Sequence, residues 1–219
     1  VCFDTETTSL NELEAELVGM SFSYKKGLAY YIPLSEKREE VLETLEIFKS
    51  FFEKEDVLKI AHNLKFDLKV LHQYGVEIKG TLFDTMIAHY LLNPDGRHGM
   101  DYLSEMYLDY KPVSIETLIG KKGKNQGTFR DVDLLEATEY AAEDADITFQ
   151  LYELFAPQLK KENLEDLFYK IEMPLMKVLA KMELAGISLD ENWLKQESID
   201  LENDLRNLEK EIFELSGEE

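Results

Sequence analysis

The sequence predicts an α/β protein with a mixed β-sheet flanked by helices, followed by a C-terminal helical segment. Strand-like segments come first along the chain, and short apolar strands then alternate with helical patterns up to about residue 161. From there to the end, apolar residues recur at helical spacing. We therefore expect one domain over residues 1–161 and the helical beginning of a second, incomplete domain over residues 162–219.

The expected strands are short apolar or alternating runs bounded by turn residues. The first three residues would end a buried strand, and a turn at 25–27 would join two strands as a hairpin. These criteria predict strands at 1–3, 17–24, 28–34, 58–61 and 81–83.

The expected helices have apolar residues three or four positions apart, and some begin at polar capping residues. Asn63 would cap a helix that ends before Gly75, and Asp84 would cap the next helix. Helices are predicted at 38–54, 64–74, 85–92, 100–108, 134–159, 164–184 and 192–215. Pro157 could break one of them. Residues 111–129 are rich in Gly and Lys without a clear period and are expected to form a loop.

Composition limits the possible functions. The 219 residues carry a formal net charge of -21, whereas a nucleic-acid-binding protein usually shows a basic surface. Residues 121–130 (KKGKNQGTFR) nevertheless hold four cations and no anion, so a locally positive loop could meet phosphates. No apolar run reaches the roughly 18 residues of a membrane span, and the acidic N-terminus does not resemble a signal peptide.

Two features of the first residues indicate the cellular compartment and the relation of the chain to a longer protein. Cys2 is the only cysteine, so no internal disulfide is possible, which fits a cytoplasmic protein. The chain begins at Val1 and has only three apolar residues before Asp4, fewer than a buried strand usually has. We therefore expect an excised piece of a longer protein.

Asp4 and Glu6 are the first candidate site residues. Side chains i and i+2 of a strand point to the same side, so these carboxylates would lie together. They would repel each other unless they share a cation, and open α/β sheets place ligands at the carboxyl ends of strands. A solvated strand end followed by a turn would also explain the pair.

Asp67, Tyr140 and Asp144 are the other candidates. Asp67 lies early in a predicted helix, where an aspartate can also serve the helix dipole. Tyr140 and Asp144 are four residues apart and share a helix face, which small alanines would let approach a sheet. Glu143 and Asp146 would point elsewhere, into solvent.

The four carboxylates and the tyrosine together suit two divalent cations. Hard oxygen ligands favour Mg²⁺ or Mn²⁺. Two such ions about 3.5–4 Å apart can hold the attacking and leaving oxygens of a phosphodiester. With only four histidines and one cysteine, the chain offers few of the nitrogen and sulfur ligands that a zinc-type site uses.

Longer motifs resemble a known family. FDTETTSL, AHNLKFDLKVL, FDTMIAHYLLNP, GRHGMDYLSE, GKKGKNQGTF and YAAEDADITFQLY together resemble the 3′→5′ proofreading exonuclease domain of bacterial (family A) DNA polymerase I. That domain belongs to the tyrosine subclass of the DnaQ-like (DEDD) exonucleases, which have a ribonuclease H-like fold. IEMPLMKVLAKMELAGISLD resembles the start of the polymerase domain, so the resemblance covers essentially the whole chain.

The resemblance implies a role for each candidate. Asp4, Glu6 and Asp144 would bind one metal ion. Asp4 would also hold the second, which Asp67 would engage mainly through water, and Tyr140 would orient the attacking water. The partner would be a single-stranded or frayed 3′ end of DNA, from which nucleoside 5′-monophosphates leave. We expect a monomer that works with the remainder of a parent polymerase chain, and no DNA synthesis by this piece, because the polymerase motifs are absent.

The resemblance also implies a set of residues near the substrate: Thr5, Leu10, Asn63, Phe66, Arg97 and Phe129. Leu10 would lie against the terminal bases, and Phe129 would stack or wedge against a single-stranded end. Leu10 could instead be core and Phe129 a loop anchor. Phe66 stands where some relatives have tyrosine, and His62 replaces a glutamine seen in others, so rate or affinity would differ.

Two other functions stay open at this point. An RNase D-like 3′→5′ exoribonuclease would use the same metal residues, although the polymerase-like tail favours DNA. A non-catalytic structural module of the polymerase would also fit the strong negative charge.

Overall fold

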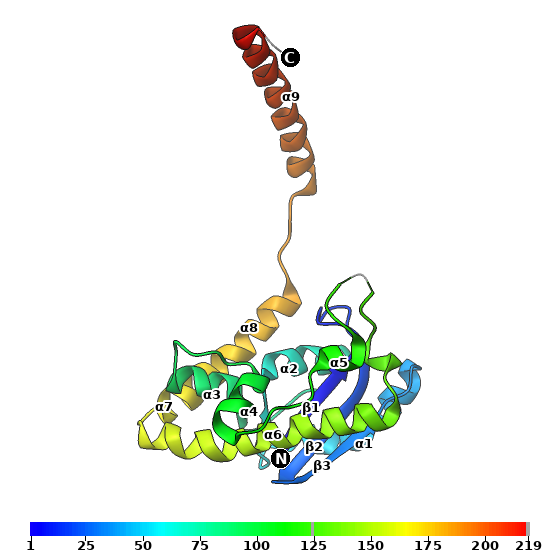
Figure 1. Cartoon of the computed structure of the whole chain (residues 1–219), viewed down its shortest axis with the longest axis vertical. Coiled ribbons are helices and arrows are strands. Elements are labelled where there is room, and N and C mark those ends of the chain that lie inside the picture. The colour runs from blue at the N-terminus through cyan, green and yellow to red at the C-terminus, as the bar shows by residue number, and fades with distance from the viewer. Residues whose placement is uncertain (124, 218–219) are drawn as a thin grey trace. The chain divides into compact units, whose positions relative to one another are not determined.

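The computed structural model describes residues 1–123 and 125–217, and the chain divides into two compact units, Val1–Leu184 and Ala185–Glu219. The first unit contains the β-sheet, and the second consists mainly of one long helix (Figure 1). The first unit thus includes residues on both sides of the expected domain boundary at residue 161, and that boundary stays a prediction.

A mixed sheet of five strands forms the centre of the first unit in the described part of the chain. Its strands are β1 (Cys2–Thr7), β2 (Leu17–Lys25), β3 (Leu28–Pro33), β4 (Lys59–Ala61) and β5 (Leu82–Asp84), in the order β3-β2-β1-β4-β5. The β1–β2 and β2–β3 pairs are antiparallel, and the β1–β4 and β4–β5 pairs are parallel. The predicted mixed sheet is confirmed.

The central strand β1 is longer than the sequence predicts. It continues past Phe3 because its acidic residues pair with β2, Asp4 opposite Ser21 and Glu6 opposite Gly19. The ladder of backbone hydrogen bonds holds these residues extended whatever their side chains. Both carboxylates therefore project from a fixed strand.

Helices flank this sheet, and most of their bounds agree closely with the predictions, but the single helix expected at 164–184 is interrupted by a π-helical turn. They are α1 (Arg38–Glu53), α2 (Leu64–Gln73), α3 (Thr85–Leu92), α4 (Met100–Leu108), α5 (Ile115–Ile119), α6 (Leu134–Lys161), α7 (Glu165–Leu167) and α8 (Met173–Ala185). A 3₁₀ turn (Phe129–Asp131) precedes α6, and a π-helical turn (Phe168–Glu172) joins α7 to α8.

The two faces of the sheet are covered by different helices. On one face, the ring of Phe3 meets Phe52 of α1 edge-on, with ring centroids 5.3 Å apart. Long helix α6 crosses the sheet and contacts β1 to β4 (Figure 1). Because successive side chains of β1 point to opposite faces, Asp4 and Glu6 point away from α1 and towards α6.

Three local predictions need correction. Part of the expected loop at 111–129 is helix α5, whose single turn is too short to show a helical period. Pro157 does not break α6, because Phe155 and Leu159 on either side of it are buried in the core. The side chain of Asn63 makes no capping hydrogen bond; the carboxylate of Asp84 accepts from the Asn63 and Leu64 N–H groups instead.

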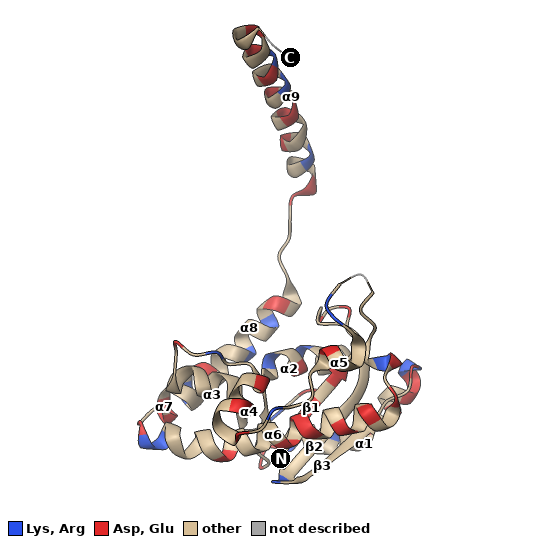
Figure 2. Ribbon diagram, in the orientation of Figure 1, with Lys and Arg blue, Asp and Glu red and all other residues tan. Residues whose placement is uncertain are grey.

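The second unit contains helix α9 (Glu191–Ser216), capped by Asp190, which accepts a hydrogen bond from Trp193 N. All its described side chains are exposed. Acidic residues lie along both α6 and α9 (Figure 2). No helix in the described ranges has the length and apolarity needed to cross a membrane.

Candidate metal centre

Three carboxylates meet where β1 lies against α6. Asp4 and Glu6 come from β1 and Asp144 from α6, and one oxygen of each lies within 4.8 Å of the others. The helix can approach so closely because Ala141 and Ala145, which flank Asp144, are fully buried with minimal side chains. The i, i+2 strand spacing thus brings the predicted pair to one side, and tertiary packing adds the third carboxylate.

The electrostatics of this cluster indicate that a positive charge would be stabilised there. Burial raises the pKa of Asp4 to about 7. Burial and then the neighbouring charge of Asp4 raise the pKa values of Glu6 and Asp144, although a side-chain hydrogen bond from Tyr140 opposes the shift of Asp144. Within the described chain, Glu6 Oε1 is buried without a hydrogen-bond partner. A buried acceptor facing two more carboxylates has the oxygen chemistry that Mg²⁺ and Mn²⁺ prefer.

Asp67 reaches the site from the opposite face of the sheet. It lies on α2, is 2% exposed, and its Oδ1 accepts a 2.5 Å hydrogen bond from Thr5 Oγ1. Burial and then the charge of Asp4 raise the pKa of Asp67, so Asp67 interacts electrostatically with the same acidic centre. It does not belong to the tight cluster of three, and its expected role at a second ion stays a prediction.

Tyr140 lies one helical turn before Asp144 on α6. Burial, followed by the charge of Asp144, raises its pKa, so the phenol stays neutral at physiological pH. Its ring packs on Phe129 with centroids 5.6 Å apart. The hydroxyl is therefore a fixed donor beside the carboxylates.

Glu143 and Asp146 are not simply solvated, contrary to the sequence prediction. Glu143 accepts hydrogen bonds from Tyr110 Oη at 2.5 Å and from the N–H of Val113 at 2.8 Å. Asp146 accepts from the N–H of Gly27 at 2.6 Å. Both carboxylates thus tie distant loops to the helix that carries Tyr140 and Asp144.

Asp84 has a larger role than the predicted helix cap. Its carboxylate caps α3 by accepting from Met86 N and Ile87 N, and it also accepts from Leu64 N at 2.8 Å. One buried side chain therefore fixes the start of α2, three residues before Asp67. No local pattern predicts this second contact, because it joins segments 20 residues apart.

A cavity of about 500 Å³ opens beside the metal centre. Besides Glu6 and Tyr140, its walls include four residues of the expected substrate set, which are Thr5, Leu10, Phe66 and Phe129. Residues of α5 and of the segment 126–128 also line this cavity, although no periodicity in the sequence marked them. Asn63 and Arg97 are exposed and do not line this cavity.

The two alternatives for Leu10 and Phe129 resolve differently. Leu10 is 84% exposed, so it is not a core residue and is free to touch a ligand. Phe129 is 3% exposed and packs against Tyr140, as a loop anchor would. Of the four cations expected in the nearby loop, Lys124 lies outside the described residues.

Comparison of the sequence with known proteins finds a 3′-5′ exonuclease family and DNA polymerase I relatives. A protein-family model described as 3′-5′ exonuclease matches residues 1–160. DNA polymerase I of Rhizobium leguminosarum is 39% identical over 100% of this chain, and DNA polymerase I of Borreliella burgdorferi is 38% identical over 99% of it. The chain spans 24% of the length of each of these relatives.

Solved structures support the same fold. The POL domain of Pol1 from M. smegmatis superposes with a TM-score of 0.74 at 21% identity, over 94% of this chain and 32% of that one. NrnC of Brucella melitensis, solved with bound Mg²⁺, superposes with a TM-score of 0.67 at 21% identity, over 84% of this chain and 85% of that one. The ribonuclease H-like fold is thereby confirmed, and the chain belongs to the 3′-5′ exonuclease family found in bacterial DNA polymerase I.

Proposed function

We propose that this chain is a metal-dependent 3′→5′ exonuclease that removes nucleoside 5′-monophosphates from DNA 3′ ends, as the proofreading part of a DNA polymerase I. The observation that carries the proposal is the buried cluster of Asp4, Glu6 and Asp144 around the unpartnered Glu6 Oε1. Its place beside an open cavity gives a substrate access to it.

The carboxylates of the cluster would hold one divalent cation, and Asp4 with Asp67 would hold a second. Bound ions supply charge that lowers the pKa of water and offsets the charge of a phosphodiester. Thr5 holds Asp67 through its Oδ1, and the other carboxylate oxygen would engage the second ion. The neutral phenol of Tyr140 donates its one proton to Asp144, and its oxygen would accept a hydrogen bond from the attacking water and so orient it.

The cavity suits a single-stranded end better than a duplex. Its wall combines exposed Leu10 with partly buried Phe66, apolar surface that unstacked terminal bases can contact. Mismatched ends unpair at a lower cost than matched ends, so they would reach the cavity more often. That difference would supply selectivity for errors without any readout of sequence. The remainder of a parent polymerase chain would deliver the strand.

The proposal is tested by following release of mononucleotides from a single-stranded DNA oligonucleotide in Mg²⁺ or Mn²⁺. The wild-type chain should release mononucleotides, and Asp4→Ala should abolish the release. Asp56→Asn, which changes an exposed aspartate in an ion pair with Lys54, serves as the control and should be as active as wild type. Equal rates for wild type and D4A would refute the assignment.

A further inference from the structure

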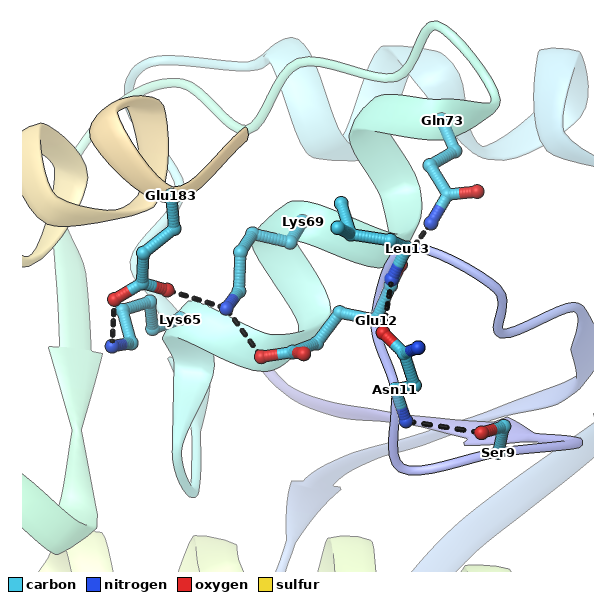
Figure 3. A network of polar contacts seen from close by, with 8 residues as sticks. All are labelled: Ser9, Asn11, Glu12, Leu13, Lys65, Lys69, Gln73 and Glu183. Atoms are coloured by element: carbon cyan, nitrogen blue, oxygen red, sulfur yellow. Dashed lines mark hydrogen bonds and ion pairs between the residues drawn. The ribbon is translucent and has the colours of Figure 1, made fainter. Parts of the chain in front are cut away.

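Lys69 is a buried cation that has no role in the exonuclease reaction proposed above. The side chain of Lys69 on α2 is only 5% exposed, and its ammonium lies between the carboxylates of Glu12 and Glu183 (Figure 3). The Lys69 Nζ to Glu183 Oε2 distance is 2.5 Å, and the other oxygen of Glu183 is 2.6 Å from Lys65 Nζ. A loop near the metal centre, helix α2 and helix α8 therefore meet at this lysine.

Helix α2 presents one face to this network and another to the metal centre. Lys65, Lys69 and Gln73 are spaced four residues apart and share a face. Asp67, two positions from either lysine, lies on a different face, where it accepts from Thr5. The same helix thus carries a candidate metal ligand and the anchors of the network.

The network holds a segment that we call the Leu10 loop, residues 8–16 between β1 and β2. Glu12 is fixed twice, because its carboxylate pairs with Lys69 and its backbone oxygen accepts from Gln73 Nε2. Leu10, only two residues before Glu12, is 84% exposed at the cavity.

The Leu10 loop is also stiffened from within. Asn11 O accepts from Glu14 N at 3.0 Å and from Ala15 N at 2.8 Å, and Thr8 N donates to Glu16 O at 3.0 Å. A loop closed by such turns moves as a unit, so an anchor at Glu12 also places Leu10.

The charges support this anchor, because the one ammonium of Lys69 lies between the carboxylates of Glu12 and Glu183. Without the ammonium, Glu12 would lose its cation while Glu183 would keep Lys65, so the attraction that holds the loop to α2 and α8 would be lost.

We propose that Lys69 is a positioning residue for the 3′ end, because it clamps Glu12 and so holds Leu10 at the wall of the cavity. The inference rests on the proposed exonuclease function. It concerns how the terminal nucleotides are held, whereas the metal carboxylates concern how the phosphodiester is cleaved.

The test compares two substrates in Mn²⁺: a single-stranded DNA oligonucleotide, and bis(p-nitrophenyl) phosphate, a diester without a nucleobase. Lys69→Met keeps the length of the side chain and removes its charge. It should raise KM for the oligonucleotide by about fivefold with little change in kcat, and leave hydrolysis of the small diester unchanged. Backbone hydrogen exchange over residues 8–16 should become faster.

Three further variants provide a rescue, a second disruption of the same ion pair and a control. Lys69→Arg can still bridge two carboxylates and should restore the wild-type KM. Glu12→Gln removes only the loop end of the clamp and should raise KM as K69M does, even if K69M folds poorly. Lys49→Met, which breaks an exposed pair with Glu46 on α1, is the control and should change nothing.

The outcomes separate the two proposals. A wild-type chain that hydrolyses neither substrate would refute the exonuclease function itself. With an active wild type, an unchanged oligonucleotide KM and unchanged exchange in both K69M and E12Q would refute the role of Lys69. Equal losses on both substrates would show a general structural role and would also overturn it.

Discussion

Thr5 Oγ1 donates a 2.5 Å hydrogen bond to Asp67 Oδ1 and so joins β1 to α2 across 62 residues of sequence. The contact is buried, with Thr5 7% and Asp67 2% exposed. Thr5 lies between Asp4 and Glu6 on the strand but points to the opposite face. One short strand segment therefore supplies two candidate metal ligands and the residue that orients another.

Removal of this hydrogen bond should weaken catalysis without abolishing it. Thr5→Val keeps the shape of the side chain and deletes the donor, so Asp67 loses its fixed orientation. We expect kcat with Mg²⁺ to fall by about tenfold, the lower end of the effect of losing an outer partner of a metal ligand. Thr5→Ser retains the hydroxyl and should stay close to wild type; equal kcat values for T5V and T5S would contradict the prediction.

The hydroxyl of Tyr140 should matter for rate and not for substrate binding. Tyr140→Phe keeps the ring that packs on Phe129 but removes the donor beside Asp144. We expect kcat for single-stranded DNA to drop by about 100-fold, with KM nearly unchanged. A variant with wild-type kcat would show that this phenol does not orient the attacking water.

Leu10 should act on the substrate and not on the fold. Leu10→Ala removes an 84% exposed side chain, so the melting temperature should not change. KM for a single-stranded oligonucleotide should rise about threefold to tenfold, because a base loses its apolar contact. Leu13→Ala alters another exposed leucine of the Leu10 loop that does not line the cavity, and it should leave KM unchanged. Equal effects of the two substitutions would argue against the contact.

The buried carboxylates predict a pH dependence of stability in the absence of metal. The pKa of Asp4 is about 7 in the folded chain and 3.8 as its ordinary value. Its contribution to stability is therefore fully present below pH 3.8 and is lost as the pH rises through 7.

Asp4→Asn removes this loss, so in EDTA the variant should melt above wild type at pH 8, by about 3 °C or more. The difference between the two melting temperatures should shrink as the pH is lowered from 8 to 4. A difference that does not change with pH would mean that Asp4 is not held in a desolvated, acidic environment.

Local spacing predicted the parts of the site that lie on single elements. The i, i+2 pair Asp4 and Glu6 and the i, i+4 pair Tyr140 and Asp144 each follow from the period of a strand or a helix. The alanines around Asp144 indicated close packing correctly, and the helix cap at Asp84 was confirmed.

Contacts between distant segments could not be predicted in this way. Glu143 binds Val113 and Asp146 binds Gly27, across 30 and 119 residues of sequence. These partners depend on how α6 lies across the sheet, and no local sequence pattern predicts that arrangement. The ion pair between Lys69 and Glu183 spans 114 residues of sequence and could not be predicted for the same reason.

Anomalous diffraction from a crystal soaked in Mn²⁺ would show whether Asp4, Glu6 and Asp144 hold divalent metal ions, as we propose. We expect two manganese peaks at the cluster, one contacting all three carboxylates and the other close to Asp4 and facing Asp67. Saturating Mn²⁺ with no anomalous peak between Asp4 and Asp144 would refute metal binding by these residues.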